Sequence, residues 1–280
     1  MNFILYFFGS GLAFFTGAAM ILLGVVLRSG FQGKRIARLV AYLVSLGLIS
    51  VILSATPFPI WSYGILVGVT MVWLKDNGAS KTKPWLNIGV VVLWLVALGF
   101  EVPYQLRPSI KLGSTKPIYV IGDSVTAGIG GSETPWTRLL ADSGFHVRSY
   151  AQPGVTTGEA LLQAQQIPAE EGLVIIEMGG NDLLGSTRSA QFRQDLEKLL
   201  AHLRGKKHRL LMFELPLPPF CNGFGSAQRE LSQKHGVELI PKRLFMGVFS
   251  ATAGTIDSIH LSQAGHQQMA ELVRSIMVKQ

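Results

Sequence analysis

The chain has 280 residues, 48% of them hydrophobic, and its 25 basic and 17 acidic side chains give a formal net charge of +8 at pH 7. The length leaves room for two modules, and the basic balance alone does not indicate nucleic-acid binding, because no motif of the known RNA- or DNA-binding modules is present. A single cysteine, Cys221, excludes an internal disulfide and a zinc cluster of cysteines. We therefore predict no nucleic-acid partner, no metal and no cofactor.

Charge is unevenly distributed along the chain. Only eight of the forty-two charged residues precede Glu101, and seven of those eight are basic. So little polar surface does not suit a soluble domain. We predict a transmembrane helical region over residues 1–100, a linker over 101–115 and a second, soluble domain over 116–280.

The apolar segments of the first region are long enough to cross a bilayer, which takes about 20 residues. Residues 2–27 and 39–74 are uncharged, and two prolines within 56–59 divide the longer run into two segments. Residues 84–100 form the last segment. We predict an all-α region of about four spans, or three if one short segment is re-entrant. A cleaved signal peptide is disfavoured, because no basic residue precedes the first segment and more apolar segments follow.

Two basic loops predict the orientation of these spans. Residues 28–38 carry four positive charges and residues 75–83 carry three lysines. Basic loops stay in the cytoplasm, and these two are the first and third connections. The second domain is therefore predicted on the periplasmic or extracellular side of the cell (inner) membrane. A linker of about 14 residues would let it reach about 45 Å from the last span if fully extended.

The second domain alternates short apolar runs with amphipathic stretches such as Ser189–Leu203. The runs cover residues 117–121, 146–151, 173–178, 209–215 and 237–241. This alternation predicts an α/β fold with a parallel sheet covered by helices on both faces. In such folds the active residues gather just beyond the carboxyl ends of the strands.

Polar segments stand at that edge of the predicted sheet. Ser124 follows the first run, Gly154 the second and Asn181 the third, while His260 precedes the last helix. A serine hydroxyl needs a base to take its proton, and the base is often a histidine held by a carboxylate. His260 has Asp257 three residues before it, and a helical turn would place both side chains on one side.

These residues predict serine ester hydrolysis. Ser124 is the candidate nucleophile, His260 the base and Asp257 the group that orients the base. The backbone N–H groups of Ser124 and Gly154 and the side chain of Asn181 are candidate donors to the oxyanion of the tetrahedral intermediate. Water then releases the acyl-enzyme.

Each residue also has a simpler interpretation. Serine is a common N-cap, which is the alternative for Ser124, and Asn181 suits a turn. Asp123 and Asp182 stand beside glycines and are expected to hold turns through their own backbone, and His266 is expected to be structural.

A different reaction would use a divalent metal for phosphoester cleavage. Its candidate ligands are Asp123, Asp182, Asp257 and His260. This alternative leaves Ser124 and Gly154 without a role.

The polar segments resemble the blocks of the SGNH (GDSL-type) hydrolase family, over residues 116–280. The family letters correspond to Ser124, Gly154, Asn181 and His260, and its Asp-x-x-His pair to Asp257 and His260. The resemblance implies a three-layer α/β/α, flavodoxin-like fold and ester hydrolysis by a Ser-His-Asp triad. Val125 stands where the family name has leucine, and "AQPGVTTG" around Gly154 is the least distinctive block. The runs "ELPLPP" (214–219) and "HLSQAGH" (260–266) are similar to the bacterial thioesterase/lysophospholipase branch.

The spans are not part of that family pattern, so the substrate follows from location. We expect acyl esters near the membrane, such as lipids or lysophospholipids, and next acylated envelope polysaccharide. The same triad would also serve an acyltransferase. A third possibility is a non-catalytic envelope receptor or assembly module.

Overall fold

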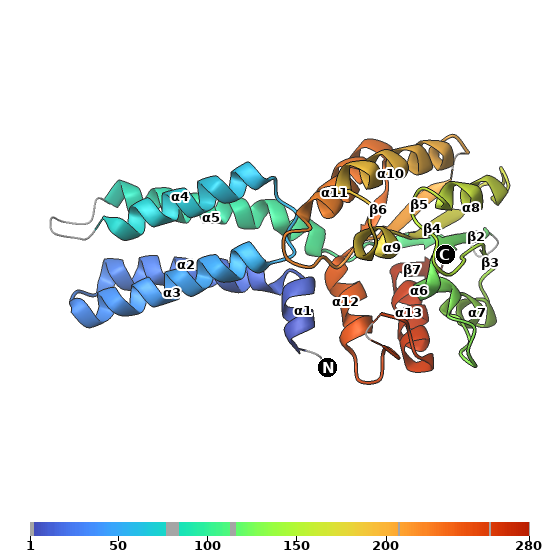
Figure 1. Cartoon of the computed structure of the whole chain (residues 1–280), viewed down its shortest axis with the longest axis horizontal. Helices are drawn as coiled ribbons and strands as arrows, with labels where there is room; N and C mark the ends of the chain where they lie inside the picture. The colour runs from blue at the N-terminus through green and yellow to red at the C-terminus, as the bar shows by residue number, and fades with distance from the viewer. Residues whose placement is uncertain (1–2, 77–83, 113–115, 207, 258, 280) are drawn as a thin grey trace.

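The computed structural model describes residues 3–76, 84–112, 116–206, 208–257 and 259–279. An elongated bundle of apolar helices extends from one side of an α/β unit (Figure 1). A short helix, α1 (Phe3–Gly9), precedes the helices of the bundle, which are α2 (Leu12–Gly30), α3 (Lys34–Leu53), α4 (Ile60–Lys75) and α5 (Pro84–Glu101).

The segment predicted as a first span, residues 2–27, is interrupted. α1 ends at Gly9, and Gly11, with a φ of 85°, redirects the chain into α2. Glycine adopts this left-handed conformation without steric cost. α1 leaves the bundle and packs against α12 (Lys242–Ser250) of the α/β unit (Figure 1).

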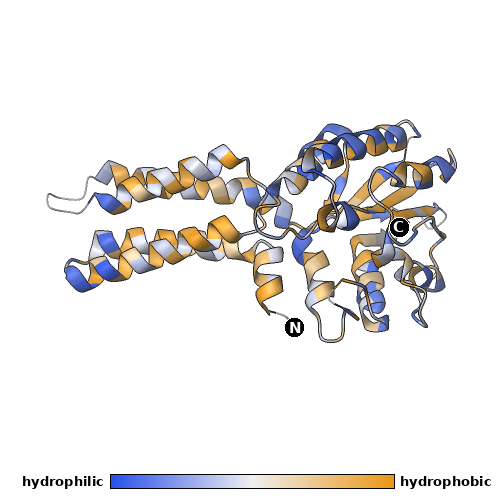
Figure 2. Ribbon diagram, in the orientation of Figure 1, coloured by the Kyte–Doolittle hydropathy of each residue, from blue (hydrophilic) through white to orange (hydrophobic). Residues whose placement is uncertain are grey.

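Three helices of the described chain are long and apolar enough to cross a membrane, namely residues 12–30, 34–53 and 84–105. α4 is also apolar but has only 16 residues. The outward side chains of α3, among them Leu39, Tyr42 and Leu46, are exposed and apolar, and Figure 2 shows the same character along the bundle. Exposed apolar surface of this extent marks contact with a partner or a membrane.

Both basic loops begin at the same end of the bundle. Arg28 donates a hydrogen bond of 2.6 Å to the carbonyl of Trp73 and lies 4.9 Å from the Trp73 ring. This end is the one farther from the α/β unit (Figure 2). Residues 77–83 of the second basic loop lie outside the described residues.

The segment predicted as a linker is packed against the α/β unit rather than extended. It continues α5 into a 3₁₀ turn, η1 (Val102–Gln105), and then into β1 (Ile110–Leu112), which pairs in parallel with β7 (Met277–Lys279). Residues 113–115 lie outside the described residues. The expected reach of about 45 Å assumed a free chain, so it does not apply to this packed segment.

Four buried charged side chains hold the bundle to the α/β unit. Glu101, at the end of α5, accepts hydrogen bonds of 2.6 and 3.0 Å from Arg229, which also donates one of 2.6 Å to Glu214. Glu214 accepts from the backbone N–H of Lys242 at 3.2 Å, and the Lys242 ammonium donates to the carbonyl of Ala55. We call Glu101, Glu214, Arg229 and Lys242 the junction network.

The α/β unit contains the five strands predicted from the apolar runs. They are β2 (Ile118–Gly122), β3 (Val147–Ser149), β4 (Leu173–Glu177), β5 (Arg209–Phe213) and β6 (Glu238–Ile240). All pairs are parallel, in the order β3-β2-β4-β5-β6. This is the flavodoxin-like order, in which the direction of strand addition reverses between the first and third strands and leaves a crevice there. The predicted fold class is confirmed.

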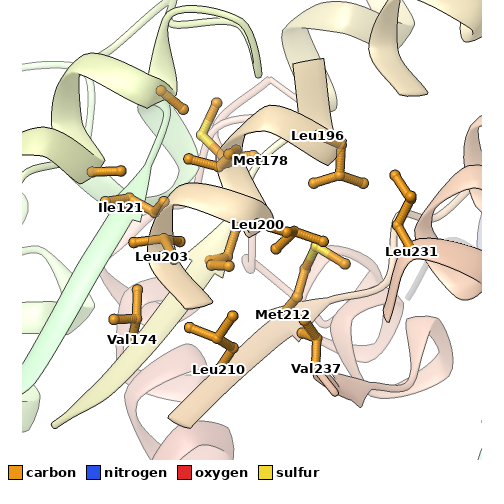
Figure 3. Packing of buried hydrophobic residues seen from close by; sticks show 14 of the residues in the cluster. Ile121, Val174, Met178, Leu196, Leu200, Leu203, Leu210, Met212, Leu231 and Val237 are labelled. Atoms are coloured by element: carbon orange, nitrogen blue, oxygen red, sulfur yellow. The ribbon is translucent and has the colours of Figure 1, made fainter. Parts of the chain in front are cut away.

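Helices cover both faces of the sheet, as Figure 1 shows. One layer is formed by α8 (Ala160–Gln166), α10 (Ser189–Arg204) and α11 (Asn222–His235), the other by α7 (Trp136–Asp142), α12 and α13 (Gln263–Ile276). Alternate strand residues supply the two cores, because successive side chains point to opposite faces. Ile121, Val174 and Met212 pack with Leu200 of α10 in the first core (Figure 3), whereas Ile118 and Val120 belong to the second.

Candidate active site

The Ser124 turn begins where β2 ends. Asp123 caps the short helix α6 (Ser124–Ala127), since its carboxylate accepts a hydrogen bond of 2.9 Å from the N–H of Val125. Asp123 thus holds this turn through a local backbone N–H, as expected. Because Asp123 is the N-cap, the alternative interpretation of Ser124 as the N-cap is wrong. A Cβ at Gly122 would lie 2.6 Å from the Thr126 hydroxyl oxygen, so this close turn requires glycine.

The side chain of Asn181 connects three of the predicted blocks. Asn181 lies on α9 (Gly180–Leu184), directly after β4, and its amide donates to the carbonyl of Val155 at 2.9 Å and to Asp123 at 3.3 Å. Val155 follows Gly154, whose φ of 80° favours glycine. Asn181 therefore ties the Gly154 loop to the Ser124 turn at the crevice between β2 and β4.

Asp182 has a different partner from the one expected. Its buried carboxylate accepts hydrogen bonds of 2.8 Å from both the N–H and the hydroxyl of Thr157. Asp182 therefore does not hold its own turn. It fixes the loop that carries Gly154, because Thr157 lies three residues beyond that glycine.

Asp257 and His260 are paired, but not through a helical turn. α13 begins only at Gln263, and one oxygen of Asp257 accepts from the N–H groups of Ile259 (3.1 Å) and His260 (2.8 Å). The other oxygen lies 2.7 Å from Nδ1 of His260. The N–H of His260, followed by its ring, lowers the pKa of Asp257 to about 2. A carboxylate at Nδ1 favours the tautomer that leaves Nε2 free to accept a proton.

His260 influences the pKa of Asp123, the residue before Ser124. Burial raises the pKa of Asp123, and the charge of His260 is among the influences that lower it. Within the described residues no hydrogen bond joins the Ser124 hydroxyl to the His260 ring. Catalytic pairs of this type often tighten only in the complex with substrate.

Glu177 is a member of this region that the sequence analysis did not identify. It is fully buried at the end of β4 and accepts a hydrogen bond of 2.9 Å from the Thr126 hydroxyl. Burial, followed by the charge of Asp123, raises the pKa of Glu177 well above its usual value. The only signal was one carboxyl residue within the apolar run "LVIIEM". We call Asp123, Glu177, Asn181 and Asp182 the rim network.

The geometry does not support the metal alternative. Among the residues that the structure describes, no three His, Cys, Asp or Glu side chains gather into a metal site, and Asp182 and Asp257 are directed to different partners. His266 is structural, as expected: it is buried, and its Nδ1 accepts from the N–H of Trp136 at 3.3 Å.

Residues 120–268 match the GDSL-like Lipase/Acylhydrolase family. The matched segment begins in β2 and ends in α13, so it contains the four polar blocks and excludes the helical bundle.

Individual relatives agree with this match. Esterase TesA of Pseudomonas aeruginosa is 27% identical over 176 residues, which cover 57% of this chain and 87% of the relative. An arylesterase of Vibrio mimicus is 24% identical over 180 residues, covering 59% and 90%. The thioesterase 1/protease 1/lysophospholipase L1 of Escherichia coli is 23% identical over 167 residues, covering 56% and 78%. The crystal structure of TesA superimposes with a TM-score of 0.50 at 27% identity, over 57% of this chain and 97% of TesA.

Proposed function

This chain belongs to the GDSL-like Lipase/Acylhydrolase family and is a serine ester hydrolase, and we propose that it works through a triad of Ser124, His260 and Asp257. The observation that supports the triad is the 2.7 Å contact between Nδ1 of His260 and Asp257, and we infer that this pair faces Ser124 at the carboxyl edge of the sheet. The three residue types in this relation are those of a serine nucleophile, its base and the group that orients the base.

In the proposed reaction, Nε2 of His260 takes the hydroxyl proton of Ser124 while the serine oxygen attacks the ester carbonyl carbon. The alcohol leaves with that proton, and an acyl-serine remains. Water then attacks the acyl carbon and gives a proton to His260, which passes it to the departing serine oxygen, so that the acid is released and the free serine is restored. Asp257 stays ionised throughout, since its pKa is lowered to about 2.

The oxyanion of the tetrahedral intermediate has three proposed donors: the N–H groups of Ser124 and Gly154 and the amide of Asn181. Donors fixed in advance stabilise developing charge without reorganising. The rim network supports this role, because Asn181 and Asp182 hold the Gly154 loop against the Ser124 turn. The Asn181 amide would exchange its 3.3 Å bond to Asp123 for one to the oxyanion.

The proposed substrates are acyl esters of membrane lipids or lysophospholipids, with acylated envelope polysaccharide as the alternative. Exposed apolar side chains lie close in sequence to the site residues: Ile129 follows α6, and Ile256 and Ile259 flank Asp257. Such side chains suit an acyl chain more than a sugar. The relative in Escherichia coli carries lysophospholipase in its name, which is consistent with this choice.

We place the protein in the cell (inner) membrane with its α/β unit on the periplasmic or extracellular side. Three membrane-length helices support the anchoring. The shared position of the two basic loops, at the end of the bundle away from the α/β unit, supports the orientation, because basic loops stay in the cytoplasm. The junction network then keeps the hydrolase close to the outer surface of the bilayer.

The reaction is tested by the hydrolysis of a short p-nitrophenyl ester with the purified full-length chain. Ser124→Ala is expected to lower kcat by at least about 10³-fold, because the nucleophile is lost. Ser186→Ala, an exposed serine beyond α9, serves as the matched control and should keep full activity. Turnover retained in Ser124→Ala would rule out the proposed nucleophile.

A further inference from the structure

A cavity of about 540 Å³ lies between the bundle and the α/β unit. Its size is within the range of about 300–1,000 Å³ that is common for small-molecule sites. None of its lining residues belongs to the Ser124 turn, the Gly154 loop, α9 or the His260 turn. It is therefore separate from the candidate active site.

The wall on the bundle side is apolar. α4 contributes Ile65 and α5 contributes Leu93 and Val96, and α5 belongs to a membrane-length helix. Trp61 and Phe100, both exposed, also line the cavity. Tryptophan is enriched at the level of the lipid headgroups, so this wall extends from the headgroup level into the hydrocarbon. Water is not available there to fill it.

The wall on the α/β side is polar and carries one charge of each sign. Arg229 lies under the Tyr104 ring, 3.8 Å from its centre, and the Tyr104 hydroxyl accepts from Gln233 at 2.6 Å. The junction network uses three N–H groups of Arg229, and a guanidinium has five. Arg229 therefore has donor capacity beyond the junction network, and it lines the cavity. Glu230, paired with Arg193 at the surface, adds a carboxylate to the same wall.

We propose that this cavity binds one zwitterionic glycerophospholipid from the outer leaflet. One acyl chain lies along α4 and α5, the phosphate accepts from Arg229, and the ammonium group is near Glu230. The junction network fixes the two walls relative to each other, so the site is formed before the lipid arrives. This inference depends on the membrane location proposed above, but not on the Ser124 reaction.

The experiment uses the full-length chain in vesicles of phosphatidylcholine that contain a phosphatidylcholine with a photoactivatable group on one acyl chain. After illumination, the labelled peptides are identified by mass spectrometry. Val96→Trp fills the cavity, and Val92→Trp is its matched control. Val92 is equally exposed on the same face of α5, one turn away, and does not line the cavity. Both variants should keep wild-type hydrolysis of the p-nitrophenyl ester.

In the wild type we expect strong labelling of the α11 and α5 peptides. This labelling should fall several-fold in Val96→Trp and stay unchanged in Val92→Trp. Unlabelled phosphatidylethanolamine should compete better than anionic phosphatidylglycerol. Equal labelling of all outward helix faces, or no effect of Val96→Trp, would overturn the site while leaving the membrane location intact. Equal competition by phosphatidylglycerol would overturn the headgroup assignment. A chain that separates from vesicles in carbonate buffer would instead overturn the membrane location itself.

Discussion

The junction network and the rim network are both built around buried carboxyl groups, but their partners differ. At the junction, Glu101 and Glu214 face Arg229 directly, with side chains no more than 7% exposed. At the rim, the carboxyl groups face amides, hydroxyls and each other, and the pKa values of Asp123 and Glu177 are raised, chiefly by burial. A buried charge needs an opposite charge. The junction meets that need with ion pairs, whereas at the rim burial disfavours the charged forms of Asp123 and Glu177 beside the proposed nucleophile.

The difference indicates what each network does. Ion pairs sealed in an interface hold two regions in one relative position, and removal of one partner leaves a costly unpaired charge. The rim instead ties the Gly154 loop to the Ser124 turn through Asn181 and Asp182. Mutations should therefore separate the two: rim changes should affect turnover, and junction changes should affect stability.

The largest expected effect is on catalysis. Asp257→Asn should lower kcat by about 10⁴-fold, because the wrong histidine tautomer is then favoured, while the melting temperature changes little, since the side chain is half exposed. Asp142→Asn, in an exposed pair with Arg138, is the control. Ester hydrolysis and thermal unfolding in detergent measure both quantities. Unaltered turnover in Asp257→Asn would remove Asp257 from the mechanism.

The junction gives the next effect. Arg229→Met should destabilise the chain by about 3–5 kcal/mol, because two carboxylates lose their buried partner. Arg193→Met removes an exposed pair with Glu230 and should cost only about 0–1 kcal/mol. Thermal unfolding of the two variants in the same detergent makes the comparison. Similar melting temperatures for both would contradict the view that the junction network holds the two regions together.

A smaller loss is expected from the rim amide. Asn181→Ala should lower kcat by about 10²–10³-fold with a modest change in KM, the range for the loss of one oxyanion donor. Steady-state kinetics on the p-nitrophenyl ester measure the effects on kcat and on KM separately. A change in KM alone would assign Asn181 to substrate binding rather than to the oxyanion.

The smallest effect concerns pH. Because the pKa of Glu177 is raised in the folded chain, the unfolded chain loses this proton at lower pH, and stability falls as pH rises above the usual glutamate pKa. Glu177→Gln cannot ionise, so its melting temperature should decline less between pH 5 and pH 8. Some decline remains, since the pKa of Asp123 is also raised. An identical dependence of melting temperature on pH in wild type and Glu177→Gln would contradict a raised pKa of Glu177 in the folded chain.

The sequence was sufficient for the sheet and for the meeting of the Ser124, Gly154 and Asn181 segments at one edge of it. Each apolar run became a strand, and the polar turns after β2 and β4 meet at the crevice because parallel strands share one carboxyl edge. The run "LVIIEM" was predictable as a strand, but the raised pKa of Glu177 was not, since it depends first on the burial of Glu177 and then on the charge of Asp123 nearby.

Other features could not be predicted because they depend on contacts between distant segments. Arg229 meets Glu101 across 128 positions, and nothing around either residue marks the pair. Nothing in the sequence marks the pairing of β1 with β7 either, because the two strands lie far apart along the chain. The break at Gly11 was missed for a different reason: an isolated glycine in an apolar run rarely ends a helix, and here the packing of α1 on α12 favours the turn.

The central claim is that Ser124 is a nucleophile activated by His260. The most direct test is to treat the full-length chain with a fluorophosphonate and identify the modified residue by mass spectrometry. We expect a single adduct on Ser124, formed rapidly in the wild type and lost in His260→Ala. An adduct on another residue, or equal labelling of Ser124→Ala and wild type, would contradict the claim.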